Sequence, residues 1–270
     1  YHGAVYAVTE SMAKIVAGGG DFSKIRFTFQ EYFRRMTSDP ERWSQPFAAL
    51  LGAYDAQIGY GLPSIGGKDS MSGTFNEIDV PPTLVSFAVD VAEKKDIITP
   101  ELKEAGNVLI QFWFDKDEYD IPVYEHVMQT YRFISRLMKA GKVKAAYALD
   151  SNGLLAGVSK MAFGNQLGVN FDHELKTLDL FENCLGDIVL EMSKEDALVL
   201  FEEKEGNGEA EELNFRKVAQ INDQAVFTYK DVTVTMEEAL DSWKSKLEKV
   251  FPTKAEKGTE PVESKLYQAD

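Results

Sequence analysis

Hydrophobic residues near the N-terminus first recur with a helical period and then alternate as in a strand. An apolar stripe with three- and four-residue spacing predicts a helix over residues 4–17. A run of glycines at 18–20 is expected to end this helix. That stripe consists of Val5, Val8, Met12 and Ile15. Residues 24–33 alternate between apolar and polar positions, so a strand is expected there.

A second helix is expected over residues 46–61, where apolar residues again follow a helical period and glycines close the segment. Its large apolar side chains are predicted to face inward; they are Phe47, Leu50, Leu51, Tyr54 and Ile58. A β-rich run follows at 82–92. The next segment, 96–106, is polar and contains a proline, so we place a domain boundary near Pro100.

The second half of the chain alternates predicted strands with predicted helices. Strands are expected at 107–114, 143–149, 167–171, 187–193, 215–222 and 225–236, and helices at 122–141, 154–164, 194–204 and 235–251. This alternation predicts sheets with helices packed on a face. Residues 252–270 lack either periodicity and are rich in Lys, Glu, Thr and Pro, which indicates a tail or linker.

Composition excludes several classes of function. The chain has 270 residues and a formal net charge of -15, which argues against binding to nucleic acid or to anionic membranes. No apolar run approaches the roughly 20 residues of a membrane span. The single cysteine, Cys184, excludes a disulfide within the chain and suits a reducing cytoplasm. An inert, half-buried thiol is favoured there over a nucleophile.

The segment "GLPSIGGKDSMSGTF" at residues 61–75 looks at first like a P-loop. A P-loop reads G-x-x-x-x-G-K-[ST] between a strand and a helix. Here Leu62 stands at the first glycine position and Asp69 replaces the hydroxyl residue after Lys68. A helix precedes the segment and strands follow it, so we exclude a P-loop.

The same segment could still bind phosphate in another way. Gly66 and Gly67 let backbone N–H groups approach a ligand, and Lys68 offers a point charge. Asp69 could orient Lys68 or hold a hydrated Mg²⁺, and Ser70 adds a hydroxyl. The alternative is a turn with an internal Lys-Asp pair. The residues alone favour neither interpretation.

A second candidate lies at residues 150–153. Asp150, Ser151, Asn152 and Gly153 follow a predicted strand and open a predicted helix. An Asp or Ser in that place can cap the helix N-terminus. The same geometry can hold phosphate, or a metal through Asp150. Capping is the commoner explanation and is favoured.

A third candidate is Glu10, which lies off the apolar stripe of the first helix. Lys14 follows four residues later, in the favourable order for a helical ion pair worth about 0.2–0.5 kcal/mol. The alternative to a solvated ion pair is a Mg²⁺ ligand.

Taken together, these segments resemble the family of large-type phosphoribosylformylglycinamidine synthase, also called FGAR amidotransferase. Residues 61–75 resemble its Gly-Lys-Asp-Ser segment, and residues 9–33 resemble the helix and strand upstream of it. Residues 150–171 resemble its Asp-Ser-Asp-Gly-Gly segment, and residues 242–251 resemble the helix that closes its synthetase region. The similarity covers most of residues 1–250 in the same order.

The resemblance implies an ATP-dependent carbon–nitrogen ligase of purine biosynthesis. In this family ATP activates the amide oxygen of formylglycinamide ribonucleotide (FGAR). Ammonia, made from glutamine in a separate glutaminase domain, then displaces phosphate to give formylglycinamidine ribonucleotide. The alternative for this part of the family's chain is a noncatalytic half that scaffolds the active half and carries a degenerate nucleotide site.

The resemblance also implies an α+β fold, the two-domain unit of aminoimidazole ribonucleotide (AIR) synthetase. Residues 1–99 would be a truncated sheet domain that pairs with an equivalent domain to form a barrel. Residues 100–250 would be a second sheet covered by helices, and 251–270 would lead toward the glutaminase. The chain starts without Met and inside a helical pattern. We therefore expect a fragment that lacks the first synthetase unit and the glutaminase domain, is inactive alone, and can form a homodimer through its exposed sheet edge.

The family's ligand positions can be carried over residue by residue. The family holds ATP or ADP and Mg²⁺ through a Glu-x-x-x-Asn pair on the first helix and the last Asp of its Asp-Ser-Asp-Gly-Gly segment. The matching nucleotide positions are Lys14, Ser151, Asn152 and Gly153, and the metal positions are Glu10 and Asp150. Lys14 replaces the family's Asn, and Ser151 or Asn152 stands near its Asp, so the site departs twice from the family pattern.

The Gly-Lys-Asp-Ser segment matches the family without departure. The resemblance implies that it faces substrate or phosphate near the interface between paired units; the residues are Gly66, Gly67, Lys68, Asp69 and Ser70. No residue is assigned to catalysis.

Overall fold

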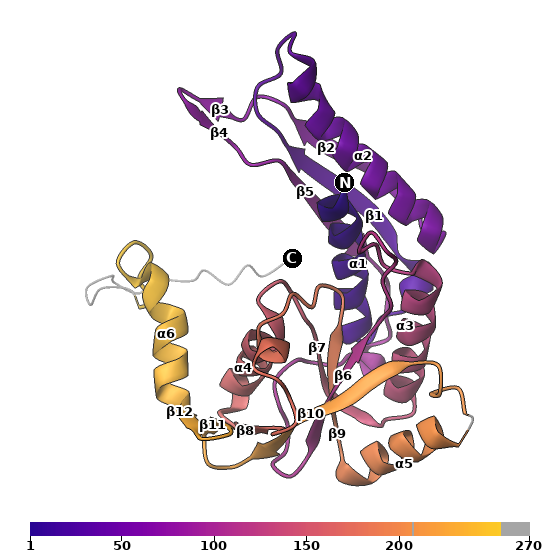
Figure 1. Cartoon of the computed structure of the whole chain (residues 1–270), viewed down its shortest axis with the longest axis vertical. Coiled ribbons are helices and arrows are strands. Elements are labelled where there is room, and N and C mark those ends of the chain that lie inside the picture. The colour runs from indigo at the N-terminus through magenta and orange to yellow at the C-terminus, as the bar shows by residue number, and fades with distance from the viewer. Residues whose placement is uncertain (207, 255–270) are drawn as a thin grey trace, which may run out of the picture.

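The first half of the chain forms a three-stranded sheet with α1 and α2 on one side (Figure 1). The structure is a computed structural model that describes residues 1–206 and 208–254. The helices and main strands of this half are α1 (His2–Ala17), β1 (Arg26–Tyr32), α2 (Pro40–Tyr60), β2 (Ser64–Ser70) and β5 (Thr83–Val89). Strand order is β2-β1-β5, with β2 parallel and β5 antiparallel to β1. The short elements are η1 (Phe22–Lys24), β3 (Thr74–Phe75), β4 (Ile78–Asp79) and η2 (Lys94–Asp96).

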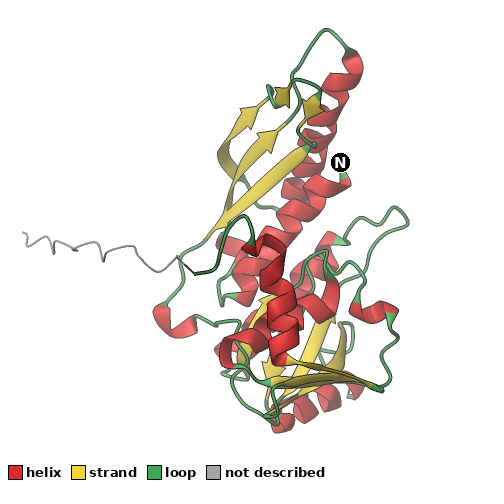
Figure 2. Ribbon diagram, turned by 90° about the vertical axis from the view of Figure 1, so that its left-hand side faces the viewer, coloured by secondary structure: helices red, strands yellow, loops and turns green. Residues whose placement is uncertain are grey.

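The second half forms a seven-stranded sheet in the order β12-β11-β8-β10-β6-β9-β7. Its strands are β6 (Val108–Trp113), β7 (Val143–Ala148), β8 (Gly168–Phe171), β9 (Ile188–Met192), β10 (Asn214–Asn222), β11 (Val226–Tyr229) and β12 (Val232–Thr235). Its helices are α3 (Tyr124–Lys139), α4 (Gly153–Asn165), η3 (Leu178–Leu180), α5 (Lys194–Glu205) and α6 (Met236–Glu248). Figure 2 shows the two sheets arranged one above the other along the molecule. The predicted alternation of strands and helices is therefore confirmed.

Alternate side chains of the larger sheet enter two different cores. Ile110 and Phe112 of β6 lie in a core shared with α1, α3 and α5. Leu109, the residue before Ile110, lies in a second core shared with α4. Successive strand residues point to opposite faces, so helices cover both sides of this sheet.

Helix α1 joins the two halves. Val5, Val8 and Met12 are fully buried, as their spacing predicted. The helix contacts α2 and β5 in the first half of the chain and β7 in the second half. Its apolar residues therefore belong to one core that continues from the smaller sheet into the larger one. The division of the chain near residue 100 stays a prediction.

The prediction that the large apolar residues of the second helix face inward is wrong. All five are exposed: Phe47, Leu50, Leu51, Tyr54 and Ile58. Small residues face α1 instead, because Ala53 and Ala56 are buried. A Cβ atom on Gly52 would lie 2.3 Å from the carbonyl oxygen of Tyr1. Such a close approach admits only small side chains, so the large ones occupy the outer face.

Local sequence explains several helix ends. The Asp39 side chain accepts a hydrogen bond from the Glu41 N–H at the start of α2, and Gly61 ends that helix in the left-handed conformation. Thr235 and Glu238 form a capping box at the start of α6.

The predicted tail lies largely outside the described part of the chain. Residues 252–254 form no helix or strand, and 255–270 are not described. Within residues 1–206 and 208–254, every helix is too short or too polar to span a bilayer.

Candidate functional site

The Gly-Lys-Asp-Ser segment lies on an edge strand. The alternative interpretation as a turn is wrong, because residues 64–70 form β2 and pair in parallel with β1. Lys68 is aligned with Gln30, and Asp69 is aligned with Glu31. Adjacent residues of a strand point to opposite faces, so Lys68 and Asp69 point apart. Accordingly, the internal Lys-Asp ion pair that the alternative interpretation required does not form among the described residues.

The two glycines of this strand have different surroundings. A Cβ on Gly67 would lie 2.5 Å from the carbonyl oxygen of Phe29, so β1 can approach β2 closely only because Gly67 lacks a side chain. Gly66 has open space where a Cβ would be, and its carbonyl accepts a hydrogen bond from Thr28 Oγ1 at 3.2 Å. At least one glycine of the motif is therefore explained by packing alone.

The two sides of this sheet differ in character. Ser86 faces α1, because its Oγ lies 2.8 Å from Ser11 Oγ. Glu31 and Asp69 lie on that side, and burial together with the nearby Asp69 carboxylate raises the pKa of Glu31. The opposite side presents Lys68 beside exposed aromatic residues of the neighbouring strands, and none of the helices within residues 1–206 and 208–254 covers it.

The first helix pairs Glu10 with Lys14, as predicted. Lys14 Nζ lies 2.7 Å from Glu10 Oε1. The ammonium group therefore occupies one side of the carboxylate that the family resemblance assigned to Mg²⁺.

The predicted cap at residues 150–153 has a different geometry. Asn152 occupies the N-cap position of α4 and its side chain makes no capping bond, so the expectation of an Asp or Ser cap is wrong. Asp150 Oδ1 instead accepts hydrogen bonds from the backbone N–H and the side-chain Nδ2 of Asn152, at 2.8 and 2.9 Å. A short Asp-centred turn replaces the cap because both donors lie only two residues away.

Lys160 of α4 completes the surroundings of Asp150. Its Nζ lies 3.1 Å from Asp150 Oδ2. Although burial opposes ionisation, the hydrogen bonds from Asn152 and Lys160 lower the pKa of Asp150. Gly153 is needed for packing, since its φ is 81° and a Cβ would lie 2.7 Å from the carbonyl oxygen of Glu182.

These residues do not fit a magnesium ion. Glu10 and Asp150 are each paired with a lysine, and a bound cation would have to displace that ammonium group. Within the described ranges, no group of three or more His, Cys, Asp or Glu side chains is arranged to hold a metal. The three predicted segments lie on β2, on α1 and between β7 and α4. No hydrogen bond or ion pair recorded among the described residues joins them.

A polar pocket at the ends of β6 and β9 has no counterpart among the predictions. Asp187 is buried there and accepts a hydrogen bond from Gln111 Nε2 at 2.8 Å. Gln111 Oε1 accepts in turn from Arg216, whose NH2 lies 3.2 Å away. Burial raises the pKa of Asp187 to about 7, while the Gln111 hydrogen bond and the charges of Lys116 and Arg216 oppose the increase. In the sequence this acid merely begins a strand, which gives no signal of burial.

Cys184 lines the same pocket. Burial raises the pKa of its thiol to about 12, with smaller contributions from the Asp187 and Glu182 carboxylates. A thiol that stays protonated at neutral pH is a poor nucleophile. The structure thus gives a physical reason for the inert thiol that the sequence favoured.

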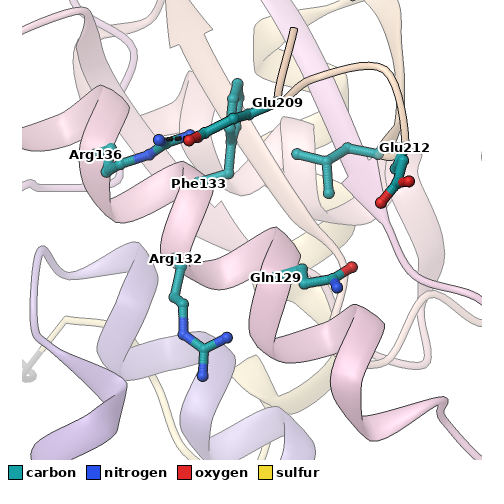
Figure 3. A pocket seen from close by; sticks show the side chains of 7 residues that line it. Gln129, Arg132, Phe133, Arg136, Glu209 and Glu212 are labelled. Atoms are coloured by element: carbon teal, nitrogen blue, oxygen red, sulfur yellow. Dashed lines mark ion pairs between the residues drawn. The ribbon is translucent and has the colours of Figure 1, made fainter. Parts of the chain in front are cut away.

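Another pocket lies on the outer side of α3, away from every predicted residue. Figure 3 shows Arg136 paired with Glu209, while the guanidinium of Arg132 points away from both. Arg132 lies 5.7 Å from the centre of the Phe22 ring. Glu212 also lines the pocket, so its lining contains two arginines and two glutamates, and no excess of either charge indicates a ligand.

Known proteins of similar sequence are subunits of one enzyme. No family model matches the chain. It is 25% identical over 178 residues to the PurL subunit of phosphoribosylformylglycinamidine synthase from Limosilactobacillus fermentum, covering 59% of this chain and 24% of that protein. It is 26% identical over 156 residues to the same subunit from Wolinella succinogenes, covering 51% of this chain and 21% of that protein.

Solved structures agree with the sequence relatives. T. maritima PurL complexed with ATP superposes with a TM-score of 0.67 at 15% identity, covering 88% of this chain and 41% of that chain. The resemblance to PurL is confirmed. The thiamine monophosphate kinase of Aquifex aeolicus has a TM-score of 0.56 at 12% identity, covering 87% of this chain and 84% of that chain. The fold is therefore the expected AIR-synthetase-like α+β unit. The chain spans about a quarter or less of the length of the PurL subunits from L. fermentum and W. succinogenes.

Proposed function

We propose that the chain is the second AIR-synthetase-like unit of a phosphoribosylformylglycinamidine synthase. That ligase uses ATP and glutamine to convert FGAR into formylglycinamidine ribonucleotide in the cytoplasm. The observation that carries the proposal is the match of fold to PurL over 88% of the chain, together with the order of the motifs. One PurL neighbour is complexed with ATP and another with FGAR, which supports these two ligands for the whole protein. The partners are then the first synthetase unit and the glutaminase domain.

Within that enzyme, this unit serves as a structural half with a degenerate nucleotide site. Lys14 and Lys160 support this role, because each neutralises a carboxylate that the family resemblance assigns to Mg²⁺. An ammonium group provides a fixed charge where the family binds a metal ion and nucleotide. The ATP and Mg²⁺ that the reaction requires would then bind to the other half of the synthetase region.

The uncovered side of the small sheet is proposed to pair with the equivalent domain of the first unit. Tyr32 and Phe87 lie on this side with 37% and 46% of their surfaces exposed. Lys68 and Ser70 belong to the same side by the register of β1 and β2. Pairing through this side would place both polar groups at the interface, where they could face substrate phosphate.

Activity assays test the ligase assignment. The purified chain, supplied with ATP, Mg²⁺, ammonium and FGAR, is expected to form no formylglycinamidine ribonucleotide, whereas a full-length protein that contains it forms product. In the full-length protein, Lys68→Ala is expected to lower kcat/KM about tenfold or more. Lys95→Ala, another exposed lysine, is the matched control. Absence of product from the full-length protein contradicts the ligase assignment. Product formation by the chain alone contradicts its dependence on the other units, and an unchanged kcat/KM in Lys68→Ala contradicts the role proposed for Lys68.

Calorimetric titration with Mg-ADP tests the structural role separately. The chain is expected to release no binding heat. Saturable binding at one site would overturn the structural role while leaving the ligase assignment intact.

A further inference from the structure

The outer side of α2 carries an apolar seam that nothing in the described chain covers. It consists of Trp43, Phe47, Leu50, Leu51, Tyr54 and Ile58, whose surfaces are between 43% and 65% exposed. Apart from the adjacent pair Leu50 and Leu51, successive members are three or four residues apart, as in the seam of a helix pair. In Figure 1, α2 runs along the outside of the molecule, with the small sheet and α1 on its other side.

Charge is excluded from this seam. From Trp43 to Tyr60, the only Asp, Glu, Lys or Arg is Asp55, in a chain of which 27% consists of these residue types. Asp55 points away from the seam, because its Oδ2 accepts hydrogen bonds from Tyr1 Oη at 2.7 Å and from Tyr124 Oη at 2.8 Å. A solvated surface helix normally presents charged side chains on its outer side. An uncharged seam of this length is typical of a surface that another helix covers.

The order of residues along the seam is symmetric. Leu50 and Leu51 lie at its centre, Phe47 and Tyr54 lie at equal distances from that centre, and so do Trp43 and Ile58. A two-fold axis between Leu50 and Leu51 would place each large side chain against the corresponding one of an antiparallel copy. In a two-fold interface residue i of one copy meets residue j of the other and j meets i, and here each such pair would consist of two large side chains.

We propose that α2 is a self-association surface, on which two copies of this chain pair with their α2 helices antiparallel. A second copy also carries a net charge of -15, so the uncharged seam is the part of α2 on which two copies can meet with no like charges placed in direct contact. Half-exposed aromatic and aliphatic side chains on both copies would together remove roughly 1,000 Å² from water, which is the lower size limit of a specific interface. The dimer is accordingly weak, with a dissociation constant in the micromolar range.

Sedimentation equilibrium of the whole chain across the micromolar range tests the proposal. The wild type is expected to shift reversibly from monomer to dimer as concentration rises. Leu50→Glu with Leu51→Glu is expected to raise the dissociation constant by more than about 100-fold, because four carboxylates would meet at the axis. Phe87→Glu, on the uncovered side of the sheet, is the matched control and leaves the constant unchanged. Circular dichroism verifies that both variants are folded.

Cysteine pairs test the register. Phe47→Cys with Tyr54→Cys is expected to cross-link two chains on mild oxidation, because these positions oppose each other across the axis. Phe47→Cys alone is not expected to cross-link, because the two identical positions would lie about 10 Å apart along the helices. Three results would overturn the proposal: a monomer at every concentration, loss of the dimer in Phe87→Glu, or equal cross-linking of the single and double variants.

Discussion

Lys14 Nζ lies 2.7 Å from Glu10 Oε1, one turn along the same helix. Lys14 is largely exposed, with 64% of its side chain accessible, so the pair contributes little to the free energy of unfolding. The ion pair matters for metal binding instead. A metal ion would need an unpaired Glu10 carboxylate, and the Lys14 ammonium group already occupies one side of it. This contact provides a way to test whether the departures from the PurL family pattern removed nucleotide binding.

Lys14→Asn combined with Asn152→Asp is expected to give the chain measurable affinity for Mg-ADP. The first change removes the ammonium group that pairs with Glu10. The second adds a carboxylate near the position that matches the last Asp of the family's Asp-Ser-Asp-Gly-Gly segment. Lys14→Asn alone is expected to change the free energy of unfolding by less than about 1 kcal/mol. Calorimetric titration measures the binding, with Lys139→Asn as a control for loss of an exposed lysine. If the double variant binds no better than the wild type, the degenerate-site interpretation is wrong.

Gly67→Ala is expected to destabilise the chain by more than about 1 kcal/mol, because the added Cβ would lie 2.5 Å from the Phe29 carbonyl oxygen and separate β1 from β2. Lys68→Ala, one residue away and exposed, is expected to stay within about 0.5 kcal/mol. Urea unfolding measures both. Equal free energies of unfolding for the two variants would show that β1 and β2 can move apart to admit the methyl group without loss of stability.

Periodicity predicted the elements of this chain well and their orientation less well. The stripe of Val5, Val8 and Met12 gave both the helix and its buried face, because α1 contacts packed elements on both sides. The pattern in α2 is equally regular, yet its large residues face outward. A hydrophobic period locates an apolar face but does not say whether this chain or a partner covers it.

The candidate site was harder to predict because backbone contacts shape it. Gly66, Gly67 and Asp69 suggested a turn, but pairing with β1 makes the segment a strand. The requirement for Gly67 comes from the Phe29 carbonyl, which is distant in sequence. Asp150 looked like part of a helix cap, and its bond to Lys160 appears only once α4 is folded. Local residue preferences carry no information about such contacts.

Glu191→Ala is expected to destabilise the chain by about 3–5 kcal/mol. Glu191 is completely buried, and its carboxylate accepts hydrogen bonds from the Lys103 N–H at 2.8 Å, the Glu104 N–H at 3.0 Å and Asn107 Nδ2 at 2.7 Å. Removing the carboxylate leaves three donors without this partner. Glu195→Ala, on the exposed side of α5, is the control and is expected to change stability by less than about 1 kcal/mol. Chemical denaturation compares the two, and a similar small effect from both would mean that solvent replaces the carboxylate.

Asp187→Asn is expected to make the chain progressively more stable than the wild type as pH rises from about 4 to about 7. Burial raises the pKa of Asp187 from 3.8 to about 7, so in this window the folded wild type holds a proton that the unfolded chain has released. The free energy of unfolding of the wild type therefore falls with pH, by up to about 1.4 kcal/mol per pH unit from this group. Asparagine keeps an oxygen that can accept the Gln111 hydrogen bond and does not titrate.

Urea unfolding at several pH values measures the difference between wild type and Asp187→Asn. Asp172→Asn is the matched control, because the pKa of Asp172 is lowered: burial opposes ionisation, but hydrogen bonds from Glu174 and Lys217 outweigh it. The stability that Asp172 contributes is present above its unfolded pKa and is lost as pH falls through its folded pKa. Asp172→Asn should therefore be less stable than the wild type at neutral pH and approach it in acid, the opposite trend to Asp187→Asn. A difference between Asp187→Asn and wild type that does not vary with pH would show that Asp187 is ionised in the folded chain as readily as in the unfolded one.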